Sequence, residues 1–220
     1  MRSLVVRLLG VAVVTVAAAC SAAAGTPPGS MPPPHGSSPD PVARADSVRN
    51  SYSPTDVEFM TGMIHHHAQA LQMAGMAPTH GASSSLQILA GRIINGQNDE
   101  IALMQQWLRE RGERVPEPAA ARMEAGMEHA MHMPGMLSEQ QLEELDEARG
   151  PEFDSLFLTF MIQHHQGALT MVNQLFDTHG AGQGDAIFKI ASDIGADQTS
   201  EIDRMRSMLR EILFETTSTP

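Results

Sequence analysis

Apolar residues recur at helical spacing along most of the chain from residue 53 onward. Between residues 56 and 74 they are separated by steps of three and four, which places them on one face of an α-helix. Three later segments show the same spacing, and strand-like alternation of polar and apolar residues is not visible. The pattern predicts an all-α protein with helices near 54–77, 84–111, 152–177 and 185–213, and a short extra helix over 138–148.

The helical region contains an internal repeat with an offset of 98 residues. Its two copies are DVEFMTGMIHHHAQALQMA at 56–74 and DSLFLTFMIQHHQGALTMV at 154–172, which share a Met-Ile-x-His-His run. Each copy is followed by Thr-His-Gly-Ala and then by Gln-x-x-Glu-Ile-x-x-Met in a second helical segment. Because short connections make each helix pair antiparallel, the repeat predicts two helical hairpins packed as a four-helix bundle with pseudo-twofold symmetry.

Polar, metal-ligating side chains lie on the inner faces of the predicted bundle. A rotation of about 100° per residue places His67 on one stripe with Met63, and His66 at the edge of that stripe. Gln97 and Glu100 share the apolar face of the second helix, at the depth of His67 in an antiparallel hairpin. The repeat predicts an equivalent set in the second hairpin: Met161, His164, His165, Gln198 and Glu201.

These inner-face residues have two interpretations. Two adjacent imidazoles on each of two helices exceed what core packing needs, and imidazole and thioether groups are copper ligands. The alternative is that each His only donates a hydrogen bond to a carboxylate while Met fills the core. Asp56 is about 16 Å from the His67 level along a helix, so we expect it to stabilise the helix dipole or pair with Arg109. Asp154 is given the same structural role.

The connector between the hairpins is rich in methionine and histidine. We expect one bundle domain over 51–216, made of hairpin one at 53–112, the connector at 113–150 and hairpin two at 151–214. The connector contains MEAGMEHAMHMPGM, whose soft and flexible ligands suit copper from solution. Its candidate ligands are Met127, His129, Met131, His132, Met133 and Met136. The alternative is an amphipathic cover over one end of the bundle, with methionine as adaptable filler.

The first 50 residues differ in composition from the helical region. Residues 1–19 carry two Arg and a short apolar run, which predicts a signal peptide of the lipoprotein type. Cys20 follows and is the single Cys, so we expect it to be lipidated; the alternative is ordinary secretion with cleavage in the Ala-rich stretch. Residues 20–50 are rich in Pro, Gly and Ser and predict a disordered tether. We therefore expect an exported lipoprotein that faces the extracytoplasmic side and touches the membrane only through Cys20.

Composition limits the classes of function. The 220 residues include 16 Met, 10 His and 1 Cys, with a net charge of −12 at pH 7. The single Cys argues against an internal disulfide and a thiolate zinc site. The negative charge argues against nucleic-acid binding and against a basic membrane-surface helix. The excess of thioether and imidazole groups instead indicates soft-metal chemistry outside the cytoplasm.

The repeated Phe-x-x-x-Met-Ile-x-His-His-x-x-Ala, with Gln-x-x-Glu-Ile-x-x-Met after each copy, resembles the bacterial domain of unknown function family three hundred and five. The resemblance covers about residues 53–212 and implies a ferritin-like four-helix bundle in an exported protein. The better-described members are periplasmic copper-binding proteins of the CopM type, which implies copper handling. The metal role carries over to His66, His67, His164, His165, Met63 and Met161, with Gln97, Glu100, Gln198 and Glu201 around them.

Three functions remain open. The first is binding of Cu(I) or Cu(II) for sequestration, tolerance or transfer to an envelope partner, with iron, manganese or zinc as other metals. Because neutral imidazole is the ligand form, affinity is then expected to fall as pH drops through ~6.5. The second is a ferritin-like iron or manganese oxidase, but such sites use Glu-x-x-His and this chain has Gln-x-x-Glu. The third is a metal-free helical adaptor. We expect a binding protein rather than an enzyme, and a homo-oligomer is open in each case.

Overall fold

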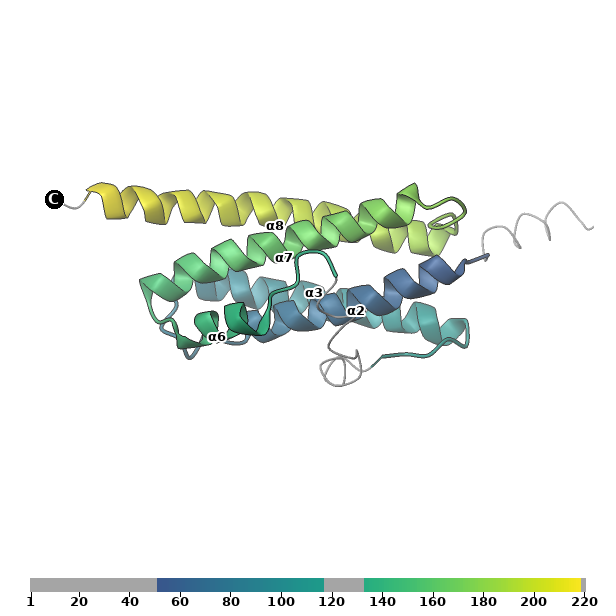
Figure 1. Cartoon of the computed structure of the whole chain (residues 1–220), viewed down its shortest axis with the longest axis horizontal. Helices are drawn as coiled ribbons and strands as arrows, with labels where there is room; N and C mark the ends of the chain where they lie inside the picture. The colour runs from purple at the N-terminus through teal and green to yellow at the C-terminus, as the bar shows by residue number, and fades with distance from the viewer. Residues whose placement is uncertain (1–50, 117–132, 219–220) are drawn as a thin grey trace, which may run out of the picture. The chain divides into compact units, whose positions relative to one another are not determined.

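The computed structural model describes residues 51–116 and 133–218 (Figure 1). These residues form helices α2 (Pro54–Ala74), α3 (Ser84–Glu110), α6 (Glu139–Glu147), α7 (Pro151–Asp177) and α8 (Asp185–Ser218). The described part contains no strand, so the all-α prediction is confirmed. The predicted signal peptide, Cys20 and the tether lie outside the described residues. Within the described helices, none combines the length and the apolar character that crossing a membrane requires.

Two antiparallel hairpins make up the bundle, as the repeat predicts. Helix α2 packs along α3, and α7 packs along α8 (Figure 1). The hairpins contact each other through α2 with α7 and through α3 with α8, while the short helix α6 packs on α7. Each long helix therefore has two neighbours inside the bundle, and a residue on its inner surface can face either of them.

The core consists of two apolar clusters separated by a polar layer. One cluster joins the second half of α2 and the first half of α3 to the start of α7 and the end of α8. The other joins the opposite halves of the same four helices. Each fully buried large apolar side chain in them contributes about 1.5–3 kcal/mol through removal from water. Buried polar side chains occupy the helix positions between the two clusters: His66, His67, Gln97, His164, His165 and Gln198.

Local capping explains where the helices begin. Ser53 caps α2 by accepting from the Asp56 amide, while the Asp56 carboxylate accepts from the Ser53 amide. Ser138 and Gln141 form the same capping box at the start of α6. Ser83 caps α3 by accepting from the Leu86 amide. Such a cap contributes about 1 kcal/mol by satisfying a backbone donor that has no partner within the helix.

The two first-turn aspartates also join the hairpins. Oδ1 of Asp56 accepts from the Gly182 amide at 2.7 Å, and both carboxylate oxygens of Asp154 accept from the Ser83 amide at 3.2 Å. Residues 83 and 182 are equivalent, because each follows a Thr-His-Gly-Ala turn. Each hairpin therefore uses its first helix to hold the turn of the other. The partners of Asp56 are backbone amides rather than the Arg109 side chain, and the structural role expected for both residues is supported.

Candidate metal centre

The polar layer is built on two equivalent His–Glu pairs. Nε2 of His67 lies 2.6 Å from Oε2 of Glu100, and Nε2 of His165 lies 2.7 Å from Oε2 of Glu201. Both imidazoles are fully buried, while the carboxylates keep 13% and 23% side-chain exposure. The antiparallel register predicted from the sequence places these residues at one depth, and the structure agrees.

The other His of each pair faces the opposite hairpin. The rings of His66 and His164 are stacked with centroids 3.8 Å apart and planes 38° apart. Nε2 of His66 lies 3.0 Å from the carbonyl oxygen of Pro134, and Nε2 of His164 lies 2.9 Å from the carbonyl oxygen of His66. His66, which was expected at the edge of the buried stripe, is itself completely buried. Adjacent helix positions differ by about 100°, so His67 faces α3 while His66 faces α7.

Hydrogen bonds at Nε2 determine which imidazole nitrogen carries the proton. The four Nε2 partners are two carbonyl and two carboxylate oxygens, which accept hydrogen bonds and do not donate them. A neutral imidazole in this position carries its proton on Nε2 and leaves the Nδ1 lone pair available. In these four rings Nδ1 is buried and has no hydrogen-bond partner among the described residues; the rings are those of His66, His67, His164 and His165. Metal-binding histidines commonly anchor their second nitrogen in this way.

Burial keeps the central imidazoles neutral. Loss of hydration and, to a smaller extent, the neighbouring His67 lower the pKa of His66 to about 3. Loss of hydration also lowers the pKa of His164 well below its usual value, and the neighbouring His66 adds to this. Protonation of these two imidazoles is thus displaced to more acidic pH than their ordinary pKa of about 6.5. Their lone pairs stay available at neutral and mildly acidic pH.

Amide and carboxylate side chains surround a small cavity next to the His–Glu pairs. This cavity of about 150 Å³ lies between α3 and α8 and is lined by Gln97, Glu100, Asp197, Gln198 and Glu201, among others. Neither amide atom of Gln97 has a hydrogen-bond partner among the described residues, and the same is true of Oε1 of Gln198. Burial raises the pKa of Asp197, and the negative charges of Glu100 and Glu201 raise it further. The two Gln thus border the layer without binding the imidazoles.

The candidate methionines lie on either side of the polar layer. Met63 and Met161 are fully buried, the first in the cluster with Phe59 and the second in the cluster with Phe153. Met133 and Met136 are half-buried. Met133 packs against the cluster that holds Met63. The remaining connector candidates lie outside the described residues: Met127, His129, Met131 and His132.

The end of the connector forms a strap across the His66 side of the layer, which sequence reasoning missed. We define the strap as residues 133–137. Its Leu137 amide donates to Gln69 at 2.8 Å, and the Gln69 amide donates to the Leu137 carbonyl at 3.0 Å. At Gly167 of α7, a Cβ atom would lie only 2.0 Å from the Pro134 carbonyl oxygen. Positions 69 and 167 are equivalent in the repeat but hold Gln and Gly. This difference is the sequence feature from which the strap contact could have been predicted.

The described residues provide pairs of ligands rather than larger sets. Within residues 51–116 and 133–218, no three His, Cys, Asp or Glu side chains are grouped so that they could hold one metal ion. A tetrahedral zinc site needs four ligands, and a di-iron site needs several carboxylates.

Comparison with known proteins connects this geometry to a family. The model of the domain of unknown function DUF305 matches residues 56–209. A DUF305 fragment from Deinococcus radiodurans is similar, with 30% identity, a TM-score of 0.61, and coverage of 73% of this chain and 98% of that chain. No curated protein matches the chain.

CopM is a second similar protein, and its solved structures include metal-bound forms. Its Cu(II)-bound form shares 30% identity at a TM-score of 0.57, covering 71% of this chain and 96% of that chain. Its Cu(I)-bound form shares 28% identity at a TM-score of 0.54, covering 73% of this chain and 98% of that chain. CopM has also been solved with silver bound. The family model and the first relative together establish that this chain belongs to the DUF305 family.

Proposed function

We propose that the bundle binds monovalent copper between the two Nδ1 atoms of each consecutive His pair. The observation that carries the proposal is that Nδ1 of both histidines in each pair, His66 and His67 or His164 and His165, is buried and has no hydrogen-bond partner among the described residues. Each ring is held from its other side by a hydrogen bond at Nε2. The ligands are therefore oriented before the ion arrives, which reduces the ordering cost of binding.

The spacing of the rings supports two-coordinate binding. The ring centroids are 6.4 Å apart for His66 and His67 and 6.1 Å apart for His164 and His165. Two imidazole nitrogens at ~2 Å from one ion, on opposite sides of it, place their ring centroids ~6 Å apart. Closed-shell Cu(I) accepts two ligands in a line, whereas zinc, iron and manganese sites recruit more.

Charge also favours a monovalent ion at this depth. A buried cation is costly unless an opposite charge compensates it. Glu100 and Glu201 each contact one imidazole of one pair, so each pair has one carboxylate beside it. One positive charge per pair is balanced by one carboxylate, whereas Cu(II) would leave a net charge in the layer.

We infer a role in copper sequestration, tolerance or transfer outside the cytoplasm. The copper- and silver-bound structures of CopM support soft-metal binding by proteins of this kind. The signal-like residues 1–19 and Cys20 support export and lipid attachment. Binding without catalysis is the role proposed here, and copper content of protein purified from its native envelope would distinguish it from a metal-free adaptor.

The test is the stoichiometry of Cu(I) under reducing conditions, measured by competition with a chromophoric Cu(I) chelator. The protein is expected to bind two ions. His66→Gln with His67→Gln should remove one, His164→Gln with His165→Gln should remove one, and all four changes should remove both. His65→Gln is the matched control, because it changes the third His of the same run. Retention of two tight ions in folded protein with all four changes would refute the proposal.

A further inference from the structure

One end of the bundle carries an aromatic cluster, the plug, which we define as Tyr52, Trp107 and Arg111. The rings of Tyr52 and Trp107 meet edge to face with centroids 5.4 Å apart. The Arg111 guanidinium lies 4.1 Å from the Trp107 ring centroid and 5.6 Å from that of Tyr52. Arg111 also forms an ion pair with Glu110 at 3.8 Å. The plug therefore combines an apolar ring surface with a cation and an acidic partner.

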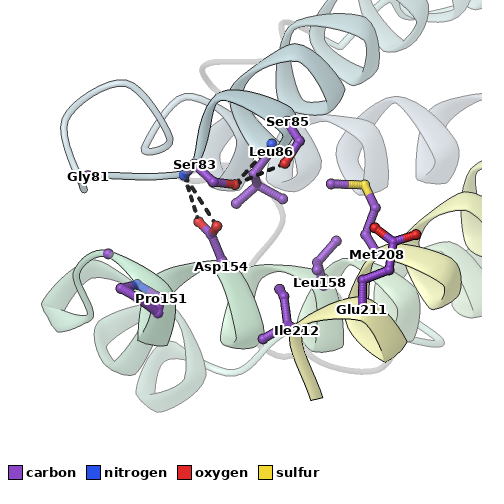
Figure 2. A pocket seen from close by; sticks show the side chains of 11 residues that line it. Gly81, Ser83, Ser85, Leu86, Pro151, Asp154, Leu158, Met208, Glu211 and Ile212 are labelled. Carbon is purple, nitrogen blue, oxygen red and sulfur yellow. Dashed lines mark hydrogen bonds between the residues drawn. The ribbon is translucent and has the colours of Figure 1, made fainter. Parts of the chain in front are cut away.

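The opposite end has a pocket where the repeat would place an equivalent plug. This end pocket has a volume of about 510 Å³. Figure 2 shows its three walls: Ser83 and Leu86 after the first turn, Asp154 and Leu158 of α7, and Met208 and Ile212 of α8. Both ends are the meeting point of a first helix, the turn of the other hairpin and the end of a second helix.

Sequence differences between the halves explain why the plug has no counterpart at the equivalent site of the other hairpin. The offset of 98 residues relates Tyr52 to Gly150. In the second helices the offset is 101 residues, which relates Trp107 to Met208 and Arg111 to Ile212. The end pocket therefore lacks two aromatic rings and one guanidinium that the equivalent site contains.

The acidic partner of the plug is retained at the end pocket. Glu211 is the equivalent of Glu110 and lines the pocket beside Met208 and Ile212 (Figure 2). No ion pair of Glu211 is found in the described part of the chain, and its side chain is exposed. Leu86, Leu158, Met208 and Ile212 supply apolar walls. An apolar pocket with a free carboxylate at its rim is complementary to an aromatic ring that has a positive charge next to it.

We propose that the end pocket binds an aromatic side chain adjacent to an arginine or lysine, presented by a partner protein. The ring takes the place that Trp107 and Tyr52 fill at the other end, and the cation pairs with Glu211. The chain's own residues outside the described ranges include no Phe, Tyr or Trp, so they do not supply the ring. The net charge of −12 also favours a basic partner surface. This inference is independent of the metal proposal.

The test uses the capped peptide acetyl-Ala-Trp-Arg-Ala-amide as the probe and methyl-detected NMR of the full protein as the readout. We expect saturable shifts of the Leu158, Met208 and Ile212 methyl signals. Replacing Arg by Glu in the peptide should weaken binding at least tenfold. Saturable shifts confined to residues elsewhere, or none up to millimolar peptide, would overturn the proposal.

Two variants of the pocket complete the test. Met208→Trp with Ile212→Arg introduces the equivalents of Trp107 and Arg111 into the end pocket and should abolish binding. Glu211→Lys changes an exposed side chain, so the fold should persist, and binding should fall at least tenfold through charge reversal. Phe188→Ala removes an exposed ring outside the pocket lining and should leave the affinity unchanged. Unchanged affinity in Glu211→Lys would contradict a basic partner. Loss of binding in Phe188→Ala would contradict binding at the end pocket, because that ring lies outside the pocket lining.

Discussion

The two hairpins have equivalent His–Glu pairs but different surroundings. In each, one His donates to a glutamate of the same hairpin at 2.6 or 2.7 Å. The other His differs, because His66 donates to the strap carbonyl of Pro134 whereas His164 donates to the backbone of His66. The repeat thus preserves ligand orientation within a hairpin, while contacts between hairpins and with the connector make the two pairs unequal.

Acidification should cause the largest loss of stability. The pKa of His66 is lowered to about 3 and that of His164 well below its usual value. Between these values and about 6.5 the unfolded chain binds more protons than the folded one, so stability is fully present above about pH 6.5 and falls with decreasing pH. Each group contributes up to about 1.4 kcal/mol per pH unit within this range, and the two groups act in the same direction.

Urea unfolding of metal-free protein across this pH range measures the slope. His164→Gln should remove about half of it, because one of the two depressed groups is gone. A free energy of unfolding that stays constant between pH 7 and 5 would contradict neutral, buried imidazoles at His66 and His164.

Gly167→Ala should displace the strap and thereby affect the His66 pair alone. Its new Cβ atom would lie 2.0 Å from the Pro134 carbonyl oxygen and 2.6 Å from the Gly135 Cα atom. Because these are backbone atoms, the strap must move and the His66–Pro134 hydrogen bond is lost. We expect a destabilisation of about 3 kcal/mol from overpacking.

Gly91→Ala is the matched control, since a Cβ atom there meets nothing within 4 Å. This control should gain about 0.5–1 kcal/mol from helix propensity. Both variants are compared by urea unfolding at neutral pH, and equal effects would show that the strap does not press on α7.

Removing the carboxylates should weaken both pairs to different extents. Glu100→Gln should cost about 2 kcal/mol, because a hydrogen bond to a charged acceptor is replaced by a neutral one. Glu201→Gln should cost less, since Glu201 is more exposed, at 23% against 13%. Each change should also lower Cu(I) affinity of its own pair about 10–100-fold, as loss of a residue that orients a ligand does. Chelator competition measures the Cu(I) affinity of each pair. An equal fall in affinity at both pairs in either single variant would contradict independent binding by the two pairs.

The aspartate contacts between the hairpins should give the smallest difference. Asp56 accepts from two amides, of Ser53 and Gly182, whereas Asp154 accepts from the Ser83 amide alone. Asp56→Asn is therefore expected to cost about 2 kcal/mol and Asp154→Asn about 1 kcal/mol. Thermal unfolding of the two variants measures the difference. A larger destabilisation in Asp154→Asn than in Asp56→Asn would contradict the expected ranking by number of amide contacts.

Local sequence information was enough to predict the helices, the repeat and the His–Glu register. These features depend on periodicity, capping and the antiparallel return of a short hairpin. The full burial of His66 could not be derived, because it depends on α7, which lies about a hundred residues away in the chain. The partners of Asp56 and Asp154 were missed for the same reason, since each is the turn of the other hairpin.

Residue spacing alone was sufficient to predict which side chains lie at each depth of the bundle and that they occur twice. It also placed the His and Met side chains on the inner faces, because helical periodicity converts residue spacing into position on a face. Only the tertiary structure decided which imidazole nitrogen is free, which His is under the strap and which end of the bundle has a pocket. These properties follow from contacts between elements that are distant in the chain. Gly167 stands where the repeat has Gln69, and Gly150 stands where it has Tyr52, so the backbone or a partner can come closer at these two places.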